Sequence, residues 1–120
     1  MQEDKPQPVD VYKAIIDELV EMTPSMTGGW ILEGKPPVDP EFAELVASLS
    51  PRQRSIVARL CNDEREGAIH DVLAHLTWWI TCRDVGLSLN GEPMPTELSG
   101  MGLHGDYIGR RQNWDWPEDQ

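Results

Sequence analysis

The 120-residue sequence has few of the residues that mark several familiar classes of small protein. It contains only two cysteines and ten basic residues against 21 acidic ones, for a formal net charge of −11. The scarcity of cysteine excludes a disulfide scaffold, and the deficit of Lys and Arg argues against binding to a polyphosphate. No apolar run approaches the ~20 residues that a helix needs to span a bilayer. We therefore expect neither a nucleic-acid partner nor a membrane segment.

The start of the chain, MQEDKPQPVD, lacks a basic region followed by an apolar one. It therefore does not look like a signal peptide or a presequence, and the expected location is the cytoplasm. Reduced cysteines suit that compartment, and a buried thiol behaves as a small hydrophobic group. Cys61 and Cys82 are accordingly predicted to pack in the core.

Negative charge is concentrated at the two ends of the sequence. Residues 1–50 contain ten acidic and three basic residues, residues 51–88 contain five of each, and residues 89–120 contain six acidic and two basic residues. Such flanks keep a protein soluble and can steer a basic partner toward it. An acidic mimic of nucleic acid is a more remote interpretation.

Apolar periodicity predicts a mainly α fold, a compact bundle of about four helices with little or no β structure. All 120 residues are assigned to a single domain because the chain is short enough for one core. A Gly/Trp-rich, irregular C-terminal segment is expected to wrap over the helices. The predicted parts are an N-terminal arm at 1–8, helices at 9–22, 40–49, 51–62 and 64–85, and the C-terminal wrap at 86–120.

Local signals support several of these boundaries. Asp39-Pro40 is a helix start, and Ser50 with Gln53 has the spacing of a capping box. The run from Pro51 could continue to Val85, but as one helix it would measure ~52 Å, against a diameter of roughly 35 Å for a compact domain of this size. Its two apolar stripes also differ by roughly 130° on a helical wheel. We therefore predict a break between Cys61 and Gly67.

Two connections are less regular. Residues 26–40 are expected to be irregular, with Trp30 to Leu32 either a short strand or a plug for the core. Asn90-Gly91 suits a hairpin turn. Four glycines in ten residues then favour close approach of the C-terminal segment to the helices, held by anchors that include Tyr107 and Trp114.

One band on the helix at 64–85 combines Asp71, His75 and Trp78. Asp71 and His75 could provide two ligands of a metal ion and His104 a third, although the HExxH and CxxC patterns are absent. The ordinary alternative pairs Asp71 with His75 on the helix surface. We predict no cofactor and assign no catalytic residue, and the C-terminal segment is expected to dock on this band.

The five tryptophans are unusual beside a single phenylalanine. Trp79 falls in the predicted core stripe, whereas Trp78 must meet the C-terminal segment, a ligand or a partner chain. Trp114 and Trp116 could form an interface with nearby arginines or fold back over Trp78, and the two interpretations are equally favoured.

The run ELSGMGLHGDYIGRRQNWDWP, with GAIHDVLAHLTWWI before it, resembles a signature of short uncharacterised bacterial proteins, a domain family of unknown function. The resemblance covers most of the chain and implies a bacterial source. The family has no known activity, so the resemblance assigns no role to any residue.

The first functional interpretation is a protein-binding or regulatory module that self-associates as a homodimer or binds another protein. The alternative is a small ligand- or metal-dependent enzyme with a pocket between the helix at 64–85 and the C-terminal segment. The candidate pocket or interface residues are Asp71, His75, Trp78, His104, Asp106, Tyr107, Arg110, Trp114 and Trp116.

Overall fold

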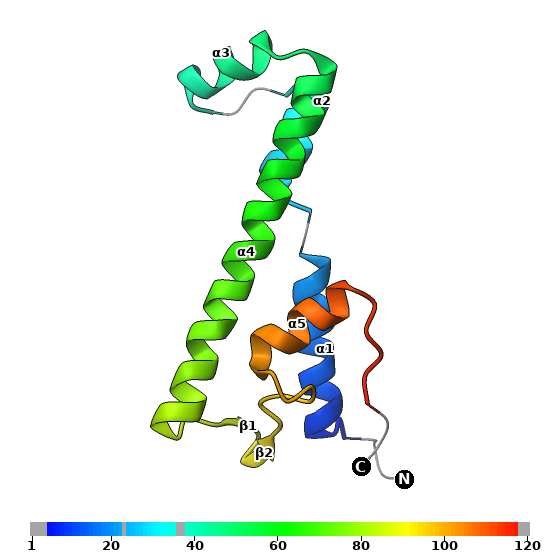
Figure 1. The fold of residues 1–120 in the computed structure, drawn as a ribbon, viewed down its shortest axis with the longest axis vertical. Helices are drawn as coiled ribbons and strands as arrows, with labels where there is room; N and C mark the ends of the chain where they lie inside the picture. The colour runs from blue at the N-terminus through cyan, green and yellow to red at the C-terminus, as the bar shows by residue number, and fades with distance from the viewer. Residues whose placement is uncertain (1–4, 23, 36–37, 118–120) are drawn as a thin grey trace. The chain divides into compact units, whose positions relative to one another are not determined.

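Helices form most of the computed structural model shown in Figure 1, which describes residues 5–22, 24–35 and 38–117. Within these ranges the strands form a single two-stranded sheet, so the predicted mainly α class is confirmed. Contacts divide the chain into two compact units: unit 1 contains residues 1–21 and 69–120, and unit 2 contains residues 22–68. None of the helices in the described ranges is both long and apolar enough to cross a membrane.

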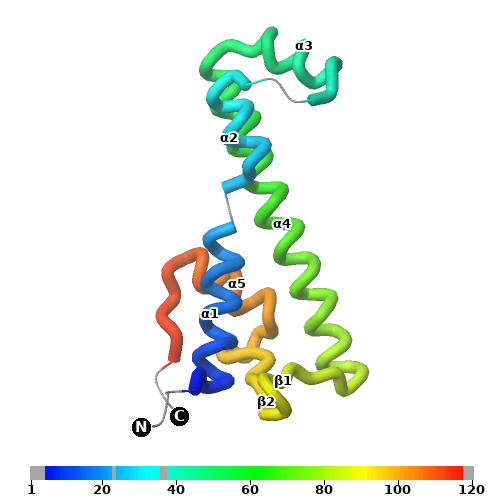
Figure 2. The backbone as a smooth tube through the Cα atoms, turned by 180° about the vertical axis from the view of Figure 1, so that it is seen from behind, coloured from blue at the N-terminus to red at the C-terminus, as the bar shows by residue number. Residues whose placement is uncertain are grey.

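Unit 1 is built on α1 (Pro8–Glu21), the C-terminal part of α4 (Pro51–Arg83) and α5 (Gly102–Arg111). Helix α1 contacts both α5 and the hairpin that follows α4. Figures 1 and 2, which view the molecule from opposite sides, show α5 lying across α1. The buried core consists of Tyr12, Ile16, Leu73, Leu103 and Tyr107. The predicted helix at 9–22 is therefore confirmed within one residue at each end, whereas residues 1–4 of the predicted N-terminal arm lie outside the described residues.

A short hairpin joins α4 to α5. Strand β1 (Leu87–Leu89) pairs antiparallel with β2 (Glu92–Met94), with Leu87 opposite Met94. The intervening Asn90 and Gly91 have φ values of 50° and 86°. Positive φ at both central residues is the requirement of a type I′ turn, which explains why this dipeptide predicted the hairpin correctly.

Helix α5 corrects the prediction of an irregular segment over 86–120. Its sequence contains two glycines after the first position and has low helix propensity, and no side chain at Met101 caps it. Instead, Glu97 Oε2 accepts the N–H of Gly102 at 2.6 Å and Thr77 Oγ1 accepts that of Leu103 at 3.1 Å. The first turn is thus completed by side chains that lie outside the helix, one of them 26 residues away in sequence.

Unit 2 contains α2 (Met26–Glu33), α3 (Pro40–Ser48) and the N-terminal part of α4. The prediction of an irregular or strand-like segment around Trp30 was wrong. Ser25 caps the start of α2 by accepting from Gly28 N, and Gly34 ends it at φ 77°. A Cβ at Gly28 would lie 3.0 Å from the carbonyl oxygen of Ala58, so this glycine allows α2 to approach α4 closely.

The starts of α3 and α4 agree with the sequence prediction. Asp39 Oδ1 accepts hydrogen bonds from Glu41 N at 2.8 Å and Phe42 N at 3.2 Å. Ser50 and Gln53 form the reciprocal capping box, with Gln53 N bonded to Ser50 Oγ and Ser50 N bonded to Gln53 Oε1. Both caps depend only on neighbours in sequence, and both are confirmed.

Helix α4 is continuous, so the predicted break between Cys61 and Gly67 was wrong. The break was inferred because one straight helix cannot bury two differently phased stripes against one core. The structure removes that premise, because the boundary between the two units falls within α4, after Ala68. Each part of the helix packs in its own unit, and the two stripes need not share a direction.

Candidate protein-interaction surface

Asp106 on α5 is completely buried and serves as a structural acceptor. Its Oδ2 accepts the Tyr12 hydroxyl at 2.5 Å and Leu98 N at 2.8 Å, while its Oδ1 accepts Ser99 N at 2.9 Å. Burial, reinforced by the hydrogen bond to Asp106 and by the negative charges of Asp106 and Glu97, raises the pKa of the Tyr12 hydroxyl. With no exposed surface, Asp106 cannot meet a ligand in this structure.

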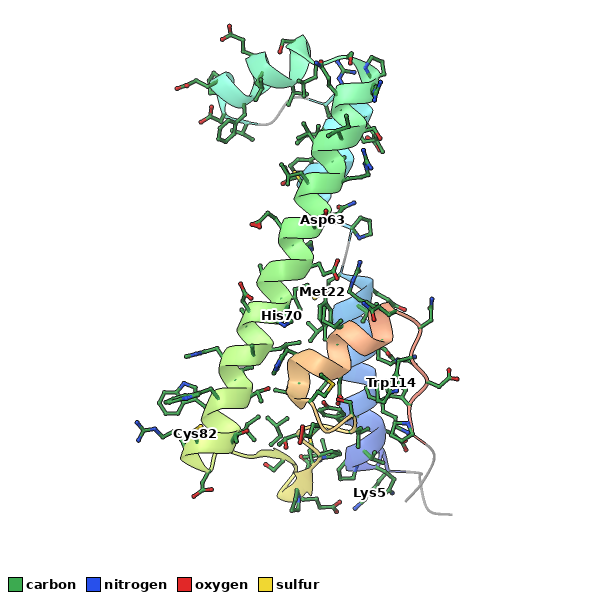
Figure 3. All side chains as sticks on the ribbon, viewed as in Figure 1. Lys5, Met22, Asp63, His70, Cys82 and Trp114 are labelled. Atoms are coloured by element: carbon green, nitrogen blue, oxygen red, sulfur yellow. The ribbon has the colours of Figure 1, made fainter. Side chains whose placement is uncertain are left out.

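The segment that contains Arg110 and Trp116 is held against α1 through Asp17. Arg110 Nε donates to Asp17 Oδ1 at 2.7 Å, and Trp116 Nε1 donates to Asp17 Oδ2 at 3.1 Å. The guanidinium of Arg110 also lies 5.1 Å from the Trp116 ring centroid and donates to the carbonyl of Trp114. These contacts place Arg110, Trp114 and Trp116 against α1, on the side where Figure 3 labels Trp114. Of the two interpretations left open for Trp114 and Trp116, folding back over Trp78 is therefore contradicted, because the contacts of this segment are made with α1.

Helix α5 meets a different face of α4 from the one predicted. The rings of His70 and His104 pack edge to face with centroids 5.2 Å apart, and His104 Nδ1 lies 3.4 Å from Thr77 Oγ1. Figure 3 labels His70 on the part of α4 that faces α5. Asp71, by contrast, has a side chain that is 83% exposed. His70 and Thr77, rather than Asp71 and His75, therefore receive the C-terminal segment.

The C-terminal part of α4 carries an exposed apolar face. The predicted core stripe of the helix at 64–85 consists of Ile69, Val72, Leu73, Leu76, Trp79 and Ile80. Half of it, Ile69, Leu73 and Ile80, joins the core of unit 1. The other half of that stripe is in solvent: Val72 is 60% exposed, Leu76 45% and Trp79 41%. We call the exposed set the α4 aromatic surface, which comprises Val72, His75, Leu76, Trp78, Trp79 and Arg83. The expectations that Trp79 and Cys82 are core residues were wrong, because both are exposed.

Side chains on the α4 aromatic surface hold one another in place. His75 stacks on Trp78 with an interplanar angle of 8°, and its Nε2 accepts from Trp79 Nε1 at 3.2 Å. Trp78 and Trp79 pack edge to face with centroids 5.2 Å apart, and the Arg83 guanidinium lies 5.4 Å from the Trp78 centroid. Rotamers fixed before binding reduce the entropy that a partner must overcome.

The metal-site hypothesis receives no support from the described residues. Asp71 is hydrogen-bonded to His70, and it is His70 that packs against His104. His75 lies in the α4 aromatic surface. No group of three or more His, Cys, Asp or Glu side chains in residues 5–22, 24–35 and 38–117 could hold a metal ion.

Comparison with known proteins adds one family assignment. The model of a family of unknown function, DUF6547, matches residues 5–118. The chain belongs to DUF6547. This confirms the resemblance to an uncharacterised domain family. Searches of curated proteins and of solved structures found no match to this DUF6547 chain.

Eight of the nine predicted site residues of this DUF6547 protein separate into two groups, and the ninth, Asp71, is exposed and paired with His70. His104, Asp106, Arg110, Trp114 and Trp116 all make contacts that fix the C-terminal segment, and Tyr107 is buried in the core with a hydroxyl that has no hydrogen-bond partner among the described residues. His75 and Trp78 belong to the exposed α4 aromatic surface.

Four residues complete the contacts of the C-terminal segment although no functional role was predicted for them: Tyr12, Asp17, His70 and Thr77. His70 and Thr77 lie about two helical turns from each other on the polar side of the predicted helix. Their shared face was the only available signal.

Proposed function

We propose that this DUF6547 protein is a protein-binding module that recognises a basic protein partner at the α4 aromatic surface. The observation that carries the proposal is the exposure of two adjacent tryptophans, Trp78 at 44% and Trp79 at 41%, beside Val72 and Leu76. A contiguous apolar patch on a soluble domain marks an interaction site, and Trp and Arg are the residues that contribute most to binding energy at interfaces.

Charge supports a basic partner. Unit 1, which carries the α4 aromatic surface, contains fourteen acidic and five basic residues, for a formal net charge of −9. Such a field accelerates the approach of a positively charged protein. At short range, Lys or Arg side chains of the partner would be attracted to the ring face of Trp79, since Trp78 already carries His75 and Arg83.

The proposal is tested by affinity capture from an extract of the source cells, followed by titration with the captured protein after purification. The double substitution Trp78→Ala and Trp79→Ala is expected to weaken binding at least about tenfold, since each truncation removes a contact of the hot-spot type. Binding of the parent should also weaken as salt is raised, because a basic partner is held partly by screened charges.

Ile15→Ala provides a matched control, because Ile15 is another exposed apolar residue of unit 1, on α1, with 47% exposure. It should capture the same basic partner as the parent, and circular dichroism should show that all three proteins are equally helical. Equal capture by the parent and the Trp78/Trp79 variant would contradict the proposal. A captured partner that is acidic, or whose binding ignores salt, would contradict the assignment of its charge.

A further inference from the structure

Unit 2 buries far less apolar surface than its composition provides. Its buried hydrophobic residues are one on each helix: Ile31 on α2, Val46 on α3 and Ala58 on α4. Nine of its large hydrophobic side chains are exposed. They are Met22, Met26, Trp30, Leu32, Val38, Phe42, Leu45, Ile56 and Leu60. An apolar surface of this extent on one small unit indicates a surface that packs against another molecule.

The exposed residues follow the helical period. Each helix of unit 2 carries a pair separated by about one turn: Met26 and Trp30 on α2, Phe42 and Leu45 on α3, Ile56 and Leu60 on α4. Residues three or four apart lie on the same side of a helix, so each pair extends an apolar face. Every helix of unit 2 therefore has a wider apolar face than the unit itself covers.

We infer that these three apolar pairs form a self-association surface, and that a second copy of this chain covers them. The area is sufficient for a stable dimer. With roughly 100 Å² exposed on each of the six paired side chains, about half the area of a whole aromatic side chain, the surface amounts to about 600 Å². Standard interfaces bury about 600–1,000 Å² on each partner, so the three pairs reach the lower end of that range.

The low net charge of unit 2 favours a second copy of this chain as the molecule that covers the self-association surface. Unit 2 contains seven acidic and five basic residues, a formal net charge of −2, against −9 for unit 1. Two copies that each carry −11 repel each other least where their surfaces are nearly neutral. A basic foreign protein would instead be attracted to unit 1.

The charged residues of unit 2 are also self-complementary. Helix α3 carries exposed Glu41 and Glu44 and no basic residue, whereas the first turns of α4 carry exposed Arg52 and Arg59 and no acidic one. In a two-fold dimer the same patch meets itself in reverse, so α3 of one copy can face α4 of the other. The apolar pairs would then be flanked by opposite charges.

The test is sedimentation equilibrium of the full-length chain over a range of concentrations. The parent should be a dimer. Phe42→Ser with Leu45→Ser should raise the dimer dissociation constant at least about hundredfold, because each exposed side chain contributes twice to a symmetric interface. Val72→Ser with Leu76→Ser is the control, since it changes another exposed apolar pair, in unit 1, and should leave the dimer intact.

Charge reversal provides a second route that leaves the apolar surface unchanged, should the serine variant fail to fold. Glu41→Lys with Glu44→Lys should weaken the dimer severalfold, and adding Arg52→Glu with Arg59→Glu should restore it. A parent that is monomeric at all concentrations would overturn the inference while leaving partner capture at the α4 aromatic surface intact. A dimer broken by the Val72/Leu76 variant, or charge reversals without rescue, would equally overturn it.

Discussion

Replacing Asp106 by Asn should destabilise unit 1 far more than an isosteric change normally does. The carboxylate is fully buried and accepts three hydrogen bonds, from the Tyr12 hydroxyl and from the backbone N–H groups of Leu98 and Ser99. An amide keeps the shape of the side chain but offers one acceptor oxygen and an NH₂ group. Whichever of the two carboxylate oxygen positions the amide oxygen takes, the NH₂ group at the other position faces at least one of the three donors.

The cost follows from the count of donors. If the amide oxygen takes the position of Oδ2, Ser99 N loses its acceptor, which costs about 1–3 kcal/mol for a buried unsatisfied group. The bonds from Tyr12 and Leu98 survive but lose their charge assistance, at about 1 kcal/mol each. The sum is about 4 kcal/mol, a large share of the roughly 5–15 kcal/mol that stabilises a typical domain.

Urea unfolding followed by circular dichroism measures this difference. With a slope of about 1.5 kcal/mol per M, the midpoint should fall by roughly 2–3 M urea. Asp115→Asn is the matched control, because Asp115 is an exposed aspartate of the same C-terminal segment, and a surface substitution should change stability by less than about 0.5 kcal/mol. A cost below about 1 kcal/mol for Asp106→Asn would refute the assignment of Asp106 as a buried acceptor of three bonds.

Two further predictions address α1 and α5. The raised pKa of the Tyr12 hydroxyl means that the unfolded chain, with tyrosine near its ordinary pKa of about 10, releases this proton first. The stability contributed by neutral Tyr12 should therefore be complete below about pH 10 and fall by up to about 1.4 kcal/mol per pH unit above it. Unfolding curves of Tyr12→Phe should lack that component, and an unchanged alkaline slope would count against the buried hydroxyl. Gly102→Ala should cost about 2 kcal/mol in urea unfolding, because φ is +82° and the new Cβ would lie 2.7 Å from Thr77 Cγ2. Gly29→Ala in α2 meets nothing within 4 Å and should be neutral or slightly stabilising. Similar costs at the two glycines would contradict the close approach of α5 to α4.

Elements specified by neighbours in sequence were predicted closely. The capping box of Ser50 and Gln53, the Asp39 cap and the Asn90-Gly91 turn each involve groups within about three residues of one another. Local geometry alone satisfies their hydrogen bonds, so the residue pattern carries the information. The helices at 9–22 and 40–49 were found for the same reason, since their periodic stripes lie between such signals.

Elements completed by distant groups were not predicted. Helix α2 contains two adjacent glycines, and one of them is needed only because α4 approaches it. Helix α5 begins on acceptors supplied by Glu97 and Thr77, and its buried Asp106 is satisfied by α1 and by a preceding loop. Periodicity reports which residues are apolar, but it does not report which of them a partner element will cover.

The sequence by itself determined the class of this protein: mainly helical, acidic, and without an apolar segment long enough for a membrane. Periodicity, capping and composition are local or additive properties, and they can be read directly. Only the tertiary structure decided that α4 is continuous, that His70 rather than His75 meets His104, and that half of the predicted apolar stripe is exposed. These outcomes depend on which elements pack together, and packing selects among apolar faces that are equivalent in the sequence.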